Sequence, residues 1–238
     1  MNNSTFESLI PVIAIGLFAL VHAGFQLGVS VLTLLSGHSL GRRHALHRTL
    51  VLNVTYIAGV AMMTGLIIAG LLYVWDIFYY CSLTDVITTL AIASTTVGIL
   101  VLVAYFRHGH GTMLWIPRAF ADYLRNRAKS TKNTVEAAVL GAVTVVAELP
   151  FTFVVMASVS YIVRLYATSS SHLAIIAAYS VAISIPLAIV TILLAGGHRL
   201  SDVQRWREAN KVFLQCASGI GLFAAALYLY VFYIGVSI

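Results

Sequence analysis

Charged residues are scarce in this sequence, and their scarcity excludes a water-soluble fold. Asp, Glu, Lys and Arg make up only 9% of the 238 residues, whereas 60% are hydrophobic and the mean hydropathy is +0.94. A soluble chain of this length could not cover its surface with so few polar groups. Several apolar segments run for about 20 residues, enough at 1.5 Å per residue to cross a hydrocarbon core of roughly 30 Å. The composition predicts an all-α integral membrane protein.

Cysteine and the common catalytic motifs are also nearly absent. Cys81 and Cys216 are the only cysteines, and they form no CxxC motif, zinc pattern or disulfide framework. There is no P-loop, nucleophile elbow or dinucleotide fingerprint, so a conventional enzyme and a bound cofactor have little support. The N-terminal "MNNSTFES" lacks the basic region of a cleaved secretory signal. The first apolar run is therefore expected to remain as a membrane span.

Six spans are expected from the apolar runs. Their approximate ranges are 9–36, 49–75, 85–106, 134–163, 172–196 and 211–236. The longest connection contains "IPRAFADYLRNRAK", in which Ile116, Phe120 and Leu124 recur every four residues between basic side chains. This spacing predicts a short helix lying on the membrane surface.

The basic residues indicate how the spans are oriented. Thirteen of the fourteen Lys and Arg residues fall in the first, third and fifth connections, and only Arg164 lies elsewhere. Lys and Arg resist translocation, so these connections are expected to be cytoplasmic, with both chain termini outside a cell (inner or cytoplasmic) membrane. The net charge of +6 then indicates attraction to anionic membrane lipids and requires no nucleic-acid partner.

Spans 1–3 resemble spans 4–6, which predicts two inverted three-helix repeats within a single membrane domain. The expected parts are repeat 1 at about 9–106, a connector at 107–133 and repeat 2 at about 134–236. "VHAGFQLGVSV" lies opposite "AELPFTFVVMA", which aligns His22 with Glu148 and Phe25 with Phe151. In a third pair of segments Gly98 is aligned with Gly221. Many secondary transporters follow this plan, with their site near the midplane between the repeats.

Glu148 is the first candidate site residue. A charged group at the centre of a membrane helix costs roughly 2.5–3.5 kcal/mol on insertion scales and is usually functional. A buried carboxylate can carry a proton or a cation, and the structural alternative is a protonated side chain bonded to a neighbouring span. His22 could pair with Glu148, ligate a metal ion or relay a proton, or serve as an interhelical hydrogen bonder.

Further candidates share the faces of these two residues or lie in spans 2 and 5. Gln26 follows His22 by four residues, and Thr152 follows Glu148 by four, so each pair shares a helical face. Asn53 and Tyr56 form a narrower polar stripe in span 2, and line a pathway or serve as packing contacts. Two prolines are also candidates: Pro150 is expected to kink span 4 beside the carboxylate, and Pro186 to interrupt span 5.

Two stretches of the chain resemble a known family: "AELPF" in span 4, and a C-terminal third that begins "AYSVAISIPLAIVTILLAGGHRLSDVQRW". The family is the six-span CcdA and DsbD membrane-domain family of cytochrome c biogenesis, within the LysE superfamily. The resemblance implies that family's fold. Its members pass electrons through one cysteine in span 1 and one in span 4, and the matching positions here are Phe25 and Phe151. Thiol–disulfide exchange requires a thiolate, so that redox activity is not expected.

The leading hypothesis is therefore a transporter of a small solute, cation or metal ion, which works by alternating access around Glu148 and His22. The alternatives are a redox-inactive assembly factor in cytochrome c or thiol biogenesis, or an electron conduit if Cys81 and Cys216 meet. A second copy of the chain and a thioredoxin-like protein are the candidate protein partners.

Overall fold

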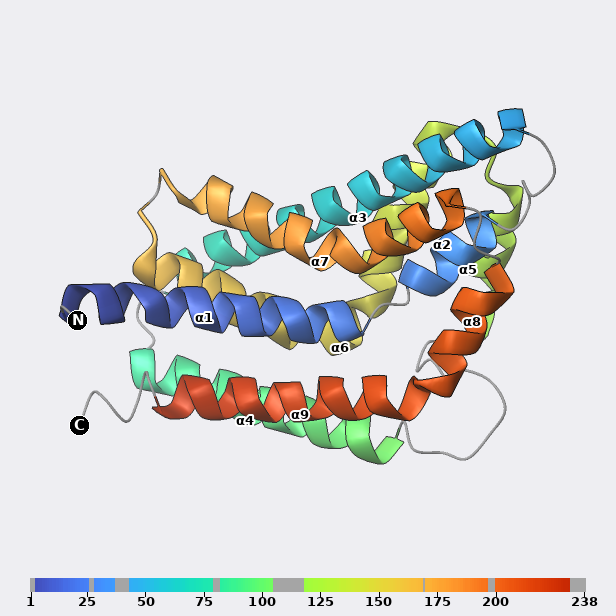
Figure 1. Cartoon of the computed structure of the whole chain (residues 1–238). Coiled ribbons are helices and arrows are strands. Elements are labelled where there is room, and N and C mark those ends of the chain that lie inside the picture. The colour runs from blue at the N-terminus through green and yellow to red at the C-terminus, as the bar shows by residue number, and fades with distance from the viewer. Residues whose placement is uncertain are drawn as a thin grey trace.

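The structure is a computed structural model, and it describes residues 3–25, 28–36, 43–78, 82–104, 118–168, 170–196 and 200–231. The described elements are all helices (Figure 1). In chain order they are α1 (Asn3–Gly24), α2 (Gly28–Ser36), α3 (Arg43–Ile77), α4 (Leu83–Ala104), α5 (Arg118–Ser130), α6 (Thr134–Tyr166), α7 (His172–Ala195), α8 (Leu200–Ala209) and α9 (Lys211–Leu229). The prediction of an all-α protein is confirmed.

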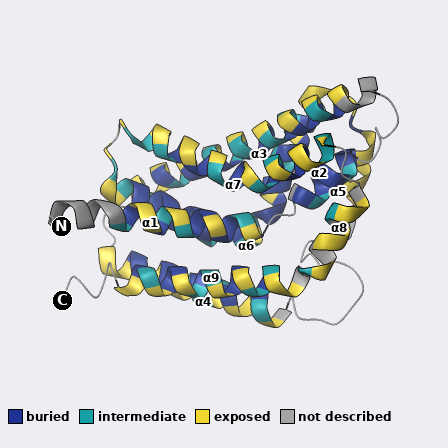
Figure 2. Cartoon of the chain, viewed as in Figure 1, coloured by how far each residue is buried: buried dark blue, intermediate teal, exposed yellow. Residues whose placement is uncertain are grey.

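Five of these helices, α3, α4, α6, α7 and α9, are long and apolar enough to cross a membrane. A bent pair formed by α1 and α2 would make a sixth span. Figure 2 shows many exposed positions on the outward faces of the bundle, and large apolar side chains such as Leu20, Met62 and Leu173 are among them. A lipid-facing apolar surface on helices, which bond their own backbone groups, is what a multi-pass membrane protein requires.

The spanning helices pack as three successive layers of two (Figure 1). α4 lies beside α9, α1 beside α6, and α3 beside α7. Between layers, α6 contacts both α4 and α3, and α1 contacts both α9 and α7. The chain therefore does not fold as two separate halves, because α3 from the first half packs most closely on α6 from the second.

The α3–α6 pair is parallel and held along its length by polar contacts. From one end to the other they are Arg48 Nη2 to the Lys132 carbonyl, the Tyr56 hydroxyl to Thr144 Oγ1, Trp75 Nε1 to Ser160 Oγ, and Arg164 Nε to Asp76 Oδ1. The sequence separation within these pairs stays between 84 and 88 residues, so the two helices keep one register.

Glycine allows the middle of α3 to approach the first part of α6 closely. A Cβ atom at Gly59 would collide with the carbonyl oxygen of Ala138, and one at Gly141 would collide with the carbonyl oxygen of Tyr56. Small residues at membrane helix crossings permit such backbone contact. This crossing lies one to two helical turns before Thr64 on α3 and Glu148 on α6.

The expected first span is broken rather than continuous. α1 ends at Gly24 and α2 begins at Gly28, and the two helical segments are bent by 49° at the break. The sequence there is "GFQLG", in which two glycines lower helix propensity. α6 runs as one helix through Pro150, so the kink that the sequence predicts there does not end the helix.

Two short helices lie at one end of the bundle. α5 confirms the predicted helix in the long connection, but its buried side chains Leu124 and Ala128 pack toward the protein, with α2 as the main neighbour. α8 lies in the fifth connection, for which the sequence predicted no span. Its helix formers and Asp202 in the first turn favour a helix, and Val203 packs against the core.

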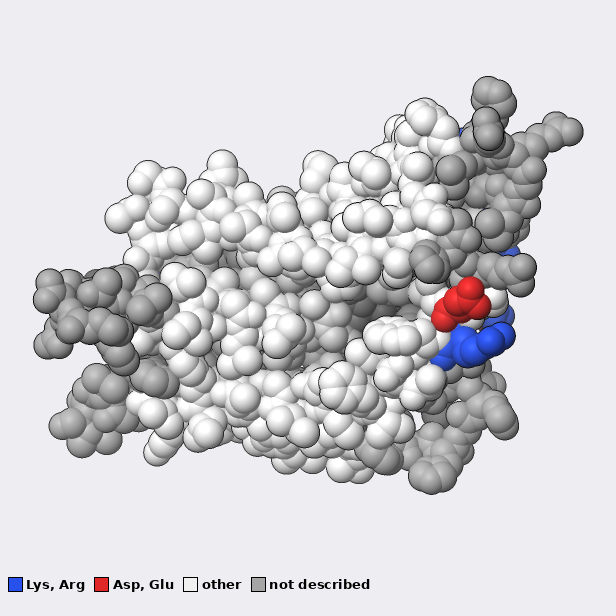
Figure 3. Space-filling model, viewed as in Figure 1, with Lys and Arg blue, Asp and Glu red and all other residues white. Residues whose placement is uncertain are grey.

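Charged side chains on the face seen in Figure 3 gather at this same end, near α8, and the described residues along the long sides of that face include none. Arg164 lies at the opposite end, where it pairs with Asp76. α1 begins and α9 ends at that opposite end as well (Figure 1). This distribution suits a bundle whose middle lies in hydrocarbon and whose two ends lie in water.

Candidate functional site

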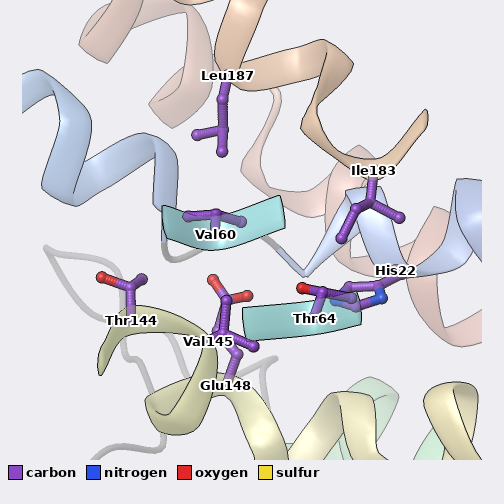
Figure 4. Close-up of a pocket in the computed structure, with 8 residues that line it drawn as sticks. All are labelled: His22, Val60, Thr64, Thr144, Val145, Glu148, Ile183 and Leu187. Atoms are coloured by element: carbon purple, nitrogen blue, oxygen red, sulfur yellow. The ribbon is translucent and has the colours of Figure 1, made fainter. Parts of the chain in front are cut away.

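A small cavity lies inside the bundle, between α1, α3, α6 and α7 (Figure 4). Its volume is about 10 Å³, close to the least space that holds one water molecule. The lining residues are His22, Val60, Thr64, Thr144, Val145, Glu148, Ile183 and Leu187. Because these positions fall near the middles of the expected spans, the cavity lies about halfway along the bundle.

Glu148 brings a carboxylate to this cavity from the centre of α6. The residue is only 8% exposed, and Figure 4 shows its carboxylate directed into the space that the lining residues surround. Thr144, one helical turn earlier, lines the same cavity, so the stripe predicted for span 4 faces the interior as expected. Thr152, one turn later, is fully buried, and its hydroxyl donates to the Glu148 carbonyl oxygen at 3.1 Å.

His22 approaches the cavity from the last turn of α1, immediately before the break in span 1. Its Nδ1 lies 2.9 Å from the hydroxyl oxygen of Tyr179 on α7, and the side chain is 3% exposed. The contact with Tyr179 fixes the orientation of the imidazole ring. The structure thus brings His22 and Glu148 to one cavity, which is the central association that the sequence predicted.

Thr64 adds a hydroxyl group that bonds to no other group among the described residues. The residue is fully buried, and Figure 4 shows its oxygen facing the carboxylate of Glu148. Seven other helical threonines donate to the carbonyl four residues earlier: Thr55, Thr89, Thr95, Thr96, Thr144, Thr152 and Thr191. Thr64 departs from this pattern, because its hydroxyl is turned from its own backbone toward the cavity.

Tyr56 and Asn53 are fully buried on α3, but neither lines the cavity. The Tyr56 hydroxyl donates to Thr144 Oγ1 at 3.1 Å, and Thr144 donates in turn to the Leu140 carbonyl. Asn53 Nδ2 donates to Ser36 Oγ at 3.0 Å, which joins α3 to α2. Tyr56 thus supports the cavity through Thr144, and Asn53 is an interhelical contact outside it.

The predicted prolines lie outside the cavity lining. Pro150 is on the exposed face of α6, and Pro186 is half-buried within α7, which continues to Ala195. Pro186 is nevertheless adjacent in sequence to Leu187, which lines the cavity. Gln26 lies outside the described residues.

Phe25 and Phe151, the positions that the family resemblance assigns to cysteines, are in contact. Their rings stack with centroids 6.3 Å apart and planes inclined by 13°. The contact joins the end of α1 to the middle of α6. Of the two cysteines, Cys216 is free in α9, and Cys81 lies outside the described residues.

Two polar residues of this site, Thr64 and Tyr179, are not among the candidates that the sequence predicted. Both are polar side chains in otherwise apolar spans, so composition alone marks them weakly. Tyr179 directly precedes Ser180 in an apolar run, and two adjacent polar residues there could have marked it as a candidate. Thr64 could not have been distinguished from the chain's other threonines, because only its side-chain orientation sets it apart.

The chemistry of the site is that of oxygen ligands and exchangeable protons. Among the described residues, no three His, Cys, Asp or Glu side chains come close enough to hold a metal ion together. In comparisons with protein-family models, curated proteins and solved structures, no match to the chain was found. A carboxylate, an imidazole and a free hydroxyl around one water-sized space can bind a small cation or pass a proton.

Proposed function

We propose that the protein is a secondary transporter that moves a small solute or cation across the inner membrane by alternating access. The observation that carries this proposal is the cavity in the middle of the bundle, where Glu148, His22 and Thr64 meet. An ionisable pair deep in a membrane bundle is costly to maintain and marks ion or substrate pathways in membrane proteins.

An inverted repeat is supported by two corresponding hydrogen bonds. Tyr56 of the second span bonds Thr144 of the fourth, and Tyr179 of the fifth span bonds His22 of the first. Tyr56 and Tyr179 are 123 residues apart in the sequence, and their partners His22 and Thr144 are 122 residues apart. Exchange of the two halves therefore converts one of these hydrogen bonds into the other. The alignment of Gly98 with Gly221 has the same separation of 123 residues. In this correspondence Thr144, rather than Glu148, is the counterpart of His22.

The helix contacts support the same symmetry. Exchange of the halves converts the α3–α6 contact into that of α7 with α1, and the α1–α9 contact into α6–α4. The pairs α3–α7, α4–α9 and α1–α6 are converted into themselves, and each of these contacts is present. Inverted repeats with a central site and a broken helix are the plan of many secondary transporters.

The arrangement of the cavity suggests which parts would move. One side of it is formed by α3 and α6, which are tied together along their length, and the other side by α1 and α7, which are joined through His22 and Tyr179. A rocking motion between these two helix pairs would open the cavity to either end of the bundle. The 49° bend between α1 and α2 would allow these two helices to move separately.

The proposed orientation places the basic end of the bundle in the cytoplasm. Exposed Arg125, Arg127 and Lys129 on α5 lie at this end, and they would contact anionic lipid head groups. Arg164 and Asp76 would then lie at the outer surface, with both chain termini on that side.

Flux measurements on purified protein in liposomes test the proposal. Radiolabelled sodium and an internal pH-sensitive dye would report cation and proton movement, with protein-free liposomes as the baseline. We expect Glu148→Gln to abolish the flux while the protein remains folded, because the substitution keeps the shape of the side chain but removes its charge. Asp202→Asn, on the exposed surface of α8, is the matched control and should leave the flux unchanged. Equal flux in folded Glu148→Gln and wild-type protein would refute the assigned role.

A further inference from the structure

We propose that the cavity binds a single Na⁺ ion, held by the carboxylate of Glu148 and the hydroxyl oxygen of Thr64. The inference rests on the proposed function and deepens it, because it names the ion that the site takes. It commits to one small monovalent cation, where the sequence left the cargo open between a solute, a cation and a metal ion.

The charge of the site favours a monovalent occupant. Among the described residues that line the cavity, Glu148 is the only acidic one, and none is Lys or Arg. One positive charge would neutralise the carboxylate, whereas a divalent ion would leave an excess charge in the middle of the bundle. An uncompensated charge at that depth is costly, so a single positive charge is the favoured complement.

Thr64 is the observation that points to a ligand rather than to a proton alone. A proton on Glu148 would neutralise the carboxylate without any second group. The fully buried Thr64 hydroxyl, however, has no hydrogen-bond partner in the described part of the chain, and it faces the carboxylate across the cavity. A buried hydroxyl without a partner costs free energy, which a coordinated cation would recover.

Size and ligand type point to sodium among the monovalent cations. The cavity of about 10 Å³ accepts one water-sized body, which excludes organic cations such as choline. Carboxylate and hydroxyl oxygens are hard ligands that suit alkali and alkaline-earth ions better than soft metals. Two side chains supply at most three oxygens, which indicates weak and exchangeable binding, and a transported ion must be able to leave its site.

Direct binding to the purified, detergent-solubilised full chain tests this inference without any transport. Thermal unfolding would be followed while NaCl replaces choline chloride at constant ionic strength and pH, with KCl replacing choline in a parallel series. A ligand that binds only the folded state raises the unfolding temperature as its concentration increases. We expect Na⁺ to raise it in a saturable manner, and K⁺ to raise it less.

Two threonine substitutions on α3 distinguish the site from a general salt effect. Thr64→Val keeps the branched shape of the side chain and removes the hydroxyl, and it should weaken Na⁺ binding by about tenfold. Thr64→Ser, which restores an oxygen, should recover most of the affinity. Thr55→Val is the matched control, because the Thr55 hydroxyl bonds to the Val51 carbonyl on the same helix and lines no part of the cavity. Glu148→Gln should abolish the Na⁺ effect.

Several results would overturn the inference. The first is that the wild-type protein unfolds at the same temperature in Na⁺, K⁺ and choline. The second is that Na⁺ raises the unfolding temperature of Thr64→Val as much as that of Thr55→Val. A site that takes only a proton would give the first of these results. The binding and flux measurements test the two proposals separately. Binding of Na⁺ without any Na⁺ flux would refute the proposed transport. Flux that depends on Glu148 without any Na⁺ binding would refute only this inference.

Discussion

The glycine crossing between α3 and α6 allows a sharp test of the architecture that carries the site. In Gly59→Ala the new methyl group would collide with the Ala138 carbonyl oxygen, and it would lie only 2.8 Å from the carbonyl carbon and 2.9 Å from the Cα of that residue. These are backbone atoms of a neighbouring helix, so no side-chain rotation can relieve the contact. The two helices must separate, and the register that aligns Thr64 with Glu148 would be disturbed.

The size of the effect follows from two opposing terms. Overpacking of a well-packed interior costs typically about 1–3 kcal/mol. Replacement of glycine by alanine within a helix recovers about 0.5–1 kcal/mol through backbone entropy and propensity. We expect Gly59→Ala to be destabilised by about 1–2 kcal/mol, a fall in unfolding temperature of several degrees if about 2–4 °C corresponds to each kcal/mol.

Gly70→Ala is the matched control, because it makes the same chemical change on the same helix. A Cβ atom at Gly70 would have nothing within 4 Å, so only the favourable term remains and the variant should be slightly more stable than wild type. Gly141→Ala, whose methyl group would collide with the Tyr56 carbonyl oxygen, should behave like Gly59→Ala. Thermal unfolding of the detergent-solubilised variants measures all three. Equal stability of Gly59→Ala and Gly70→Ala would contradict the close backbone approach of α3 and α6 at Gly59.

Two further predictions follow from the hydrogen bonds and the charge distribution. Tyr179→Phe and Tyr56→Phe each remove one of the two corresponding hydrogen bonds. Each substitution should lower the unfolding free energy by about 0.6 kcal/mol, and by at most about 1.7 kcal/mol. A loss of stability in only one of the two variants would argue against the correspondence of the halves. The orientation can be tested by labelling single cysteines with a membrane-impermeant maleimide in intact cells. The background would carry Cys81→Ser and Cys216→Ser, and the single cysteine would be introduced as Ser82→Cys or as Ser130→Cys. Ser82→Cys should react at once and Ser130→Cys only after lysis, and the reverse pattern would invert the proposed topology.

The helices were predictable because hydrocarbon imposes a simple rule on the chain. A segment that crosses a membrane must be apolar for about 20 residues and must bond its own backbone, so the runs that became α3, α4, α6, α7 and α9 can be recognised without tertiary information. The rule fails at the ends of the bundle. There α8 forms from a polar segment whose helix depends on local propensity and on contact with the core.

The candidate site was partly predictable for a similar reason. A carboxylate and a histidine in apolar runs are costly, so Glu148 and His22 were noticeable from sequence, and the structure places both at one cavity. Pro150 and Pro186 do not line the cavity, because proline affects the backbone of its own helix but does not set which way its face points. Pro150 is exposed, and the break in the bundle occurs in span 1 between two glycines.

The amino-acid sequence by itself determined that the chain is helical and apolar, and it showed which buried positions carry polar groups, because these properties depend on local composition and periodicity. Tertiary structure alone decided that α3 pairs with α6 across the two halves, and that the Thr64 hydroxyl is directed into the cavity rather than to its own backbone. Both depend on contacts between residues far apart in the chain and on the orientation of a single side chain. Neither leaves a periodic pattern in the sequence.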